Sequence, residues 1–147
     1  MDLKRYKIIK IEKKNESNKK RKIIYIESKN KKDKCPICNE YTSSIHDKLR
    51  PIELKYLKIV ETNTMINIIK KRFICHRCNK RFVENLELND KGKTITNKLT
   101  QKVLKDLLNY NLSIKYIANE NNISAGTVRN ILIKVMSKYP KLIKNLP

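Results

Sequence analysis

Four cysteines in two matched pairs are the residues of this sequence best suited to chemistry. "CPIC" contains Cys35 and Cys38, "CHRC" contains Cys75 and Cys78, and these are all the cysteines among the 147 residues. A CxxC turn lets two thiolates bond one ion, and a tetrahedral Zn²⁺ needs two such turns, with Zn–S bonds of about 2.3 Å. The pattern therefore predicts one structural zinc ion with a complete shell of four thiolates and no open position for water.

A redox role for the dithiols is the main alternative. It requires a CxxC pair at the start of a helix that follows a strand, and neither pair has that context. The segment "MDLKRYKIIKIEKK" lacks the apolar region of a signal peptide. We therefore expect the chain in a reducing cytosol, where clustered cysteines bind metal more often than they form disulfides. His46 and His76 are expected to face solvent or phosphate and not the metal.

The charge of the chain points to a polyanionic partner. With 35 basic and 14 acidic residues, the formal net charge is +21, which suits nucleic acid or an anionic membrane. No apolar run approaches the roughly 20 residues that span a bilayer, so a membrane partner is not expected. Residues 1–34 alone carry 14 basic and 5 acidic side chains.

The first two thirds of the chain are expected to form strands. Residues 1–34 predict a basic β-hairpin from "YKIIKI" and "RKIIYIES", with a disordered basic tail as the alternative. Residues 35–88 predict a zinc β-ribbon. Its expected parts are a strand over 44–50, a loop opened by Pro51, a long strand "TMINIIKKRFIC" ending on Cys75, and one more strand in "NKRFVENL". Residues 89–93 are expected to be a linker.

The last third changes to a helical period, and residues 94–140 predict three helices. The first contains Leu99, Val103, Leu104, Leu107 and Leu108, and Asn111 is expected to end it in a left-handed conformation. Ser113 and Ser124 are expected to cap the second and third helices. The third is expected to stop before Pro140, leaving residues 141–147 as a tail.

The last two helices fit a DNA-binding helix-turn-helix. Ala118 falls where the first helix must be small, and Asn122 falls at the turn, where Asn tolerates the required conformation. A generic helical hairpin is the alternative, but it requires neither residue. The inward stripe of the third helix is Val128, Ile131, Leu132, Val135 and Tyr139.

The opposite face of the third helix is expected to meet DNA. In a helix-turn-helix, the N-terminal part of the recognition helix contacts base edges in the major groove, and that helix is the third one here. Arg129 is suited to guanine, Asn130 to adenine and Ile133 to a thymine methyl group. The full set of expected DNA contacts is Ser124, Gly126, Thr127, Arg129, Asn130, Ile133, Lys134 and, from the preceding helix, Lys115. The two lysines are expected to bind phosphates.

The order of these parts resembles the N-terminal region of insertion-sequence transposases of the ISL-three group. The most specific piece is "RFICHRCNKRF", in which Arg72, Phe73, Cys75, Cys78 and Phe82 match the family's basic run into RFxCxxCxxxF. The resemblance extends over residues 5–138. It implies recognition of terminal inverted repeats, with catalysis in a later RNase H-like domain whose acidic trio holds two metal ions.

This chain departs from the family at that later domain. Asp106 and Glu120 are the acidic residues of the last 50 positions, and neither has an acidic partner nearby. We therefore expect no enzyme here. The expectation is an α+β protein with a β-hairpin, a zinc ribbon and a helix-turn-helix module, which binds double-stranded DNA at terminal inverted repeats. A truncated or split copy would work beside a separate catalytic chain or as a homodimer, in the bacterial cytoplasm near the nucleoid.

Three other functions stay open from the sequence. The first is a stand-alone transcriptional regulator or transposition inhibitor that competes for the same repeats. The second is a zinc-ribbon RNA-binding protein, although few aromatic residues are present for base stacking. The third is a redox enzyme that uses the dithiols.

Overall fold

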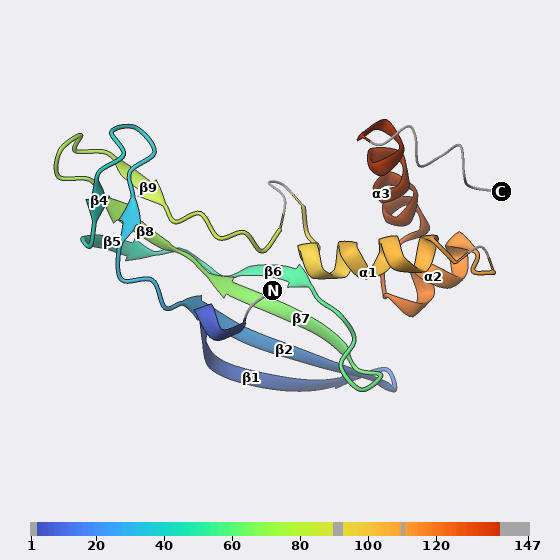
Figure 1. Cartoon of the computed structure of the whole chain (residues 1–147). Helices are drawn as coiled ribbons and strands as arrows, with labels where there is room; N and C mark the ends of the chain where they lie inside the picture. Colours follow the sequence, from blue (N-terminus) through green and yellow to red (C-terminus); the bar gives the residue numbers. More distant parts are fainter. Residues whose placement is uncertain (1–2, 90–92, 110, 139–147) are drawn as a thin grey trace.

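The computed structural model describes residues 3–89, 93–109 and 111–138, and over these ranges the chain is α+β (Figure 1). The predicted linker residues 90–92, Tyr139 and the tail 141–147 lie outside them. A short 3-10 turn, Leu3–Arg5, comes first. The strands are β1 Tyr6–Glu16, β2 Lys19–Ser28, β3 Asp33–Lys34, β4 Tyr41–Thr42, β5 Ile45–Lys48, β6 Ile52–Lys55, β7 Asn63–Ile69, β8 Lys71–Ile74 and β9 Arg81–Val83. The helices are α1 Asn97–Leu107, α2 Ile114–Glu120 and α3 Ala125–Lys138.

The largest sheet has the strand order β1-β2-β7-β6. The first two strands pair in antiparallel register, as expected of the hairpin, and their connection contains Ser17 and Asn18 in left-handed conformation. β2 then pairs in parallel with β7, a contact that the sequence pattern did not predict. The predicted hairpin, 1–34, and the predicted ribbon segment, 35–88, therefore share one sheet.

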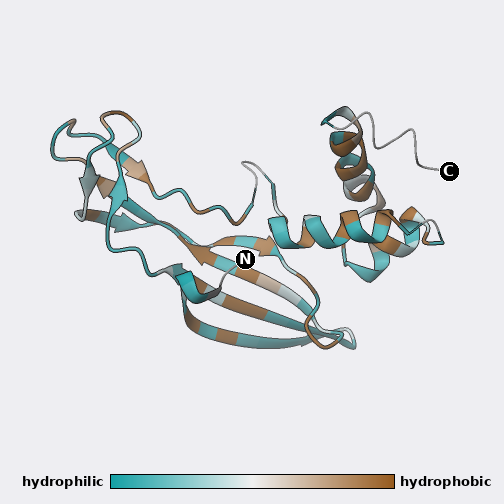
Figure 2. Cartoon of the chain, viewed as in Figure 1, coloured by the Kyte–Doolittle hydropathy of each residue, from teal (hydrophilic) through white to brown (hydrophobic). Residues whose placement is uncertain are grey.

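One face of this sheet carries the first hydrophobic core. Ile26, Leu54, Ile66 and Ile68 are buried there, and the extended segment after β9 covers them with Leu86 and Leu88. Figure 2 shows the apolar residues concentrated on the middle strands of this sheet. β7 is flanked by β2 and β6 on its two edges, which explains its nearly continuous burial.

Two expectations for the middle of the chain were wrong. The residues after Pro51 form β6, because they pair in antiparallel register with β7 instead of looping out. The predicted long strand ending on Cys75 breaks at Lys70 into β7 and β8. Its two halves have different partners: β7 belongs to the large sheet, whereas β8 lies between β5 and β9 in a second sheet. The predicted strand in "NKRFVENL" is confirmed as β9.

The three helices enclose a second core of Leu99, Val103, Ile117, Ala118, Val128 and their neighbours. Thr96, Ser113 and Ser124 accept hydrogen bonds from the first turns of α1, α2 and α3, so the two predicted serine caps are confirmed. The cap by Thr96 was not predicted. α1 ends at Leu108 in right-handed conformation and not at Asn111, because the Leu108 N–H already bonds the carbonyls of the last turn.

The helices dock on the large sheet through Lys55 of β6. Its backbone N–H donates to Thr94 O at 2.9 Å, and its carbonyl accepts from the Thr96 N–H at 3.0 Å. Its ammonium donates to Asn122 O at 2.9 Å, which ties the strand to the turn between α2 and α3. Among the described residues, no helix has the length and hydrophobicity needed to cross a bilayer.

Candidate metal centre and helical surface

Two turns of the same geometry present the four cysteines. The first lies between β3 and β4, and the second lies between β8 and β9. In each, the N–H of the first cysteine donates to a carbonyl five residues later, Cys35 to Glu40 and Cys75 to Lys80, both at 2.8 Å. The residue after the second cysteine, Asn39 or Asn79, is left-handed, with φ of 62° and 55°. Asn accepts this conformation more readily than most residues.

The two turns bring all four sulfur atoms together. The four Sγ atoms lie within 4.8 Å of one another, and Cys38 Sγ lies 3.5 Å from Cys75 Sγ. Tetrahedral coordination with bonds of about 2.3 Å requires sulfur separations of about 3.8 Å. Cys35 and Cys75 are buried, and the other two cysteines are half-buried. The cluster therefore has the size, donor set and enclosure of a structural zinc site.

The second sheet and its surroundings hold the two turns against each other. β5 pairs with β8, and Thr42 Oγ1 donates to Ile74 O at 2.8 Å, directly before Cys75. Phe73 stacks on Phe82 with ring centroids 5.9 Å apart, which packs β8 on β9. Across the two turns, the Arg77 guanidinium bonds the Glu40 carboxylate at 2.9 Å.

The thiols do not ionise alike when no cation is present. The backbone N–H of Cys38, with that of Ile37, lowers the pKa of the Cys35 thiol to about 7. The pKa of Cys78 is raised to about 12, first by its hydrogen bond with Cys38 and then by burial. Four thiolates this close repel one another, and the positive charge of a bound metal ion offsets that repulsion and keeps the coordinating thiols deprotonated. The donor set thus fits a dication.

The two histidines lie outside the cysteine cluster, as predicted. His76 Nε2 is hydrogen-bonded to Ser44 Oγ at 2.5 Å, and both His46 and His76 are exposed. Asn39 and Asn79, which shape the turns, were not predicted from the sequence. A signal for them was present, because "CPICN" and "CHRCN" share the asparagine as well as the cysteines.

A buried polar junction joins the metal-bearing sheet to the large sheet. Glu84, only 2% exposed, accepts from Ser28 Oγ at 2.6 Å and from the Lys71 backbone N–H at 2.9 Å. The Lys71 ammonium donates to the carbonyls of Ser28 and Asn30. These bonds link the end of β2, the start of β8 and the segment after β9.

The residues predicted to meet DNA lie mainly on the exposed surface of the helices. Thr127 is half-buried, and the following are exposed: Lys115, Ser124, Gly126, Arg129, Asn130, Ile133 and Lys134. Ile133 is 61% exposed, which is unusual for an isoleucine in the middle of a helix. Ser124 Oγ accepts from the Thr127 N–H at 3.0 Å, so its hydroxyl acts as the cap of α3.

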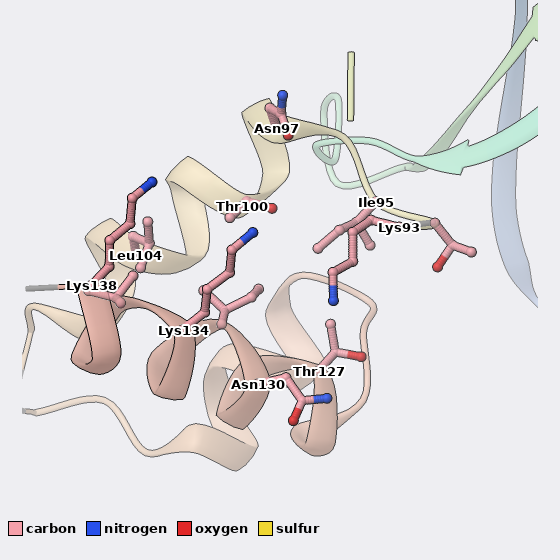
Figure 3. A pocket seen from close by; sticks show the side chains of 12 residues that line it. Lys93, Ile95, Asn97, Thr100, Leu104, Thr127, Asn130, Lys134 and Lys138 are labelled. Atoms are coloured by element: carbon pink, nitrogen blue, oxygen red, sulfur yellow. The ribbon is translucent and has the colours of Figure 1, made fainter. Parts of the chain in front are cut away.

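A groove of about 340 Å³ separates α3 from α1 and holds part of this set (Figure 3). Its apolar lining is Ile95, Leu104, Ile131 and Val135. Its polar lining is Lys93, Thr94, Asn97, Thr100, Thr127, Asn130, Lys134 and Lys138. The structure thus brings three of the predicted residues together with Lys93, which precedes α1, and with Asn97 and Thr100 of α1, which were not predicted. Arg129, Ile133, Gly126 and Lys115 do not line this groove.

The chain was also compared with known proteins. The family described as "zinc-finger of transposase IS204/IS1001/IS1096/IS1165" matches residues 31–78, which include all four cysteines. No curated protein and no solved structure matches the chain. Together with the four clustered sulfur atoms, the match establishes one structural zinc ion. Residues 31–78 are therefore similar to the zinc ribbon of these transposases, and the four-cysteine cluster supports that similarity.

Proposed function

We propose that this protein binds double-stranded DNA in a sequence-specific manner, as the part of an ISL-three-type transposase that recognises the terminal inverted repeats. The transposase zinc ribbon and the net charge of +21 both support DNA as the partner. The observation that carries the proposal is α3, a helix with an exposed polar face that α2 and a tight turn hold over a packed core.

The geometry of α2, the turn and α3 supports a helix-turn-helix. Ala118 is 3% exposed and lies in the core with Val128, so its small side chain lets the helices approach. Asn122 is left-handed with φ of 53°, and the Ile123 N–H bonds Ala118 O at 3.0 Å across the turn. Residues 94–140 are accordingly proposed as the DNA-binding module.

Base recognition is assigned to the exposed side of α3. Arg129 is proposed to donate to guanine and Asn130 to adenine, while Ile133 contacts a thymine methyl group. Lys134 and Lys115 are proposed to bind phosphates on either side of the groove. Gly126 and Thr127 lie at the start of α3, where a helix approaches the bases closely.

The zinc ribbon is proposed as a scaffold, with Cys35, Cys38, Cys75 and Cys78 as the four ligands. Thiolates fill the tetrahedral shell, so the ion contributes folding free energy and no catalytic water. The proposed activity is binding. Strand cleavage would come from an RNase H-like domain outside these 147 residues.

Two substitutions test the assignment of α3. Arg129→Ala is expected to reduce discrimination at one base pair by about 1–3 kcal/mol, whereas Lys115→Ala lowers affinity for all duplexes alike. Lys31→Ala, in the loop before the first cysteine turn, is the matched control and is expected to change neither. Affinity is measured on terminal-repeat and scrambled duplexes over a range of salt concentrations. Equal, sequence-blind losses from Arg129→Ala and Lys115→Ala would remove the recognition-helix assignment.

A further inference from the structure

The tip of the β1–β2 hairpin is the most cationic short segment of the chain. Six of the ten residues 13–22 are basic, and Glu16 is the single acidic one. Residues 13–20 are all exposed. This segment lies at the far end of the large sheet from the cysteine turns (Figure 1).

The register of the hairpin places like charges directly opposite each other. Lys13 pairs with Lys22, and Lys14 pairs with Arg21. Such pairs destabilise a hairpin, because cross-strand side chains are only about 5 Å apart. Arg21 is relieved by an ion pair with Glu53 at 2.8 Å. Within the described part of the chain, Lys13 and Lys22 have no such acidic partner.

A second unusual feature lies at the same end of the sheet. Arg21 is the register partner of Asn63, so the β6–β7 loop lies beside the hairpin tip. In that loop Val60 is 91% exposed and left-handed, with φ of 48°. A β-branched residue rarely adopts this conformation, and such outliers concentrate at functional sites. The end of the sheet thus joins Lys13 and Lys22 to a loop tip made of two exposed, left-handed residues, Val60 and the acidic Glu61.

We propose that this end of the sheet is a second contact with duplex DNA, separate from α3, in which Lys13 and Lys22 bind backbone phosphates. The inference rests on the proposed function and adds a bipartite footprint to it. A phosphate between the ammonium groups of Lys13 and Lys22 would attract both, whereas water alone leaves the two groups repelling each other. A two-stranded β-ribbon and an apolar tip are both known means of entering a DNA groove.

Lys13→Glu tests the proposal with effects of opposite sign on folding and on binding. It turns the Lys13–Lys22 pair into an ion pair, so the Tm of the DNA-free protein is expected to rise by about 1–2 °C. Loss of one phosphate contact reduces the magnitude of the slope of log K against log salt concentration by about 0.9. If both proteins bind equally at 1 M salt, the variant then binds about 15-fold more weakly than wild type at 50 mM salt. Lys31→Glu makes the same charge change in the loop between β2 and β3, and it is expected to keep the wild-type slope.

Footprinting of the full chain on a terminal-repeat duplex gives the second readout. Lys13→Glu is expected to lose protection at one end of the site and to retain it where α3 binds. Wild-type protein that binds no duplex would overturn the proposed function itself. Three outcomes would overturn the hairpin contact alone, given that the wild-type protein binds. In the first, Lys13→Glu and Lys31→Glu have the same salt slope and footprint as wild type; in the second, both variants lose affinity equally. The third is a lower Tm for Lys13→Glu. A loss confined to RNA, with DNA affinity unchanged, would overturn it as well.

Discussion

Glu84 holds the zinc-bearing sheet to the large sheet, and Glu84→Leu tests that role. The carboxylate is 2% exposed and accepts from Ser28 Oγ and from the Lys71 N–H. Leucine has a similar volume but accepts neither bond. The substitution therefore leaves a hydroxyl and a backbone N–H buried without an acceptor.

The expected loss follows from those two donors. Each buried unsatisfied donor costs about 1–3 kcal/mol, so Glu84→Leu should lower the free energy of unfolding by about 4 kcal/mol. That is a large part of the roughly 5–15 kcal/mol available to a domain. For a chain of this size it corresponds to about 12 °C in Tm. Urea unfolding followed by circular dichroism, with zinc in the buffer, measures the change.

Two further variants sharpen the experiment. Glu84→Gln can still accept from the Lys71 N–H through its oxygen and donate to Ser28 Oγ through its amide, so we expect a loss of only about 1 kcal/mol. Glu87→Leu makes the same change at an exposed position three residues later and should be nearly neutral. A Glu84→Leu protein within 1 kcal/mol of Glu87→Leu would refute the junction as a stabilising contact.

Three other predictions follow from single features of the structure. Chelation should release one zinc ion per chain, expose four titratable thiols and abolish cooperative unfolding. The reason is that the binding energy of such sites is on the order of 10 kcal/mol. Metal-free protein with an unchanged urea midpoint would contradict this. Val60→Asn should raise the free energy of unfolding by about 1 kcal/mol in thermal unfolding, because Asn tolerates the left-handed conformation observed there; a lower Tm would mean that the valine is not strained. Thr96→Ala should lower the free energy of unfolding by about 1 kcal/mol, because α1 loses its buried N-cap. The helical content at high temperature should fall with it. A neutral effect would show that α1 does not depend on this cap.

Features encoded by neighbouring residues could be predicted from the sequence. The two CxxC turns, the caps at Ser113 and Ser124 and the left-handed Asn122 were all expected, and the structure contains them. Each depends on residues within a few positions, so the local pattern is sufficient. The same holds for the helical period of α1 and α3, whose apolar stripes meet in one core.

Features that depend on distant partners could not be predicted in this way. "TMINIIKKRFIC" is a uniform β-forming run, and its break at Lys70 arises because β7 and β8 have partners in different sheets. Nothing near Pro51 indicates that β6 will pair with β7. Lys93 and Asn97 join the α3 groove only because Lys55 anchors the start of α1 to the sheet.

The sequence alone determined the zinc chemistry, the cationic character and the three helices, because thiol spacing, charge and helical period need no knowledge of the rest of the chain. The tertiary structure alone decided that β2 pairs in parallel with β7, that Glu84 is buried and accepts from Ser28, and that Lys13 faces Lys22. Strand register and burial depend on which of several similar β-branched runs pack together. That choice depends on the free energy of the whole packed assembly and not on any local pattern.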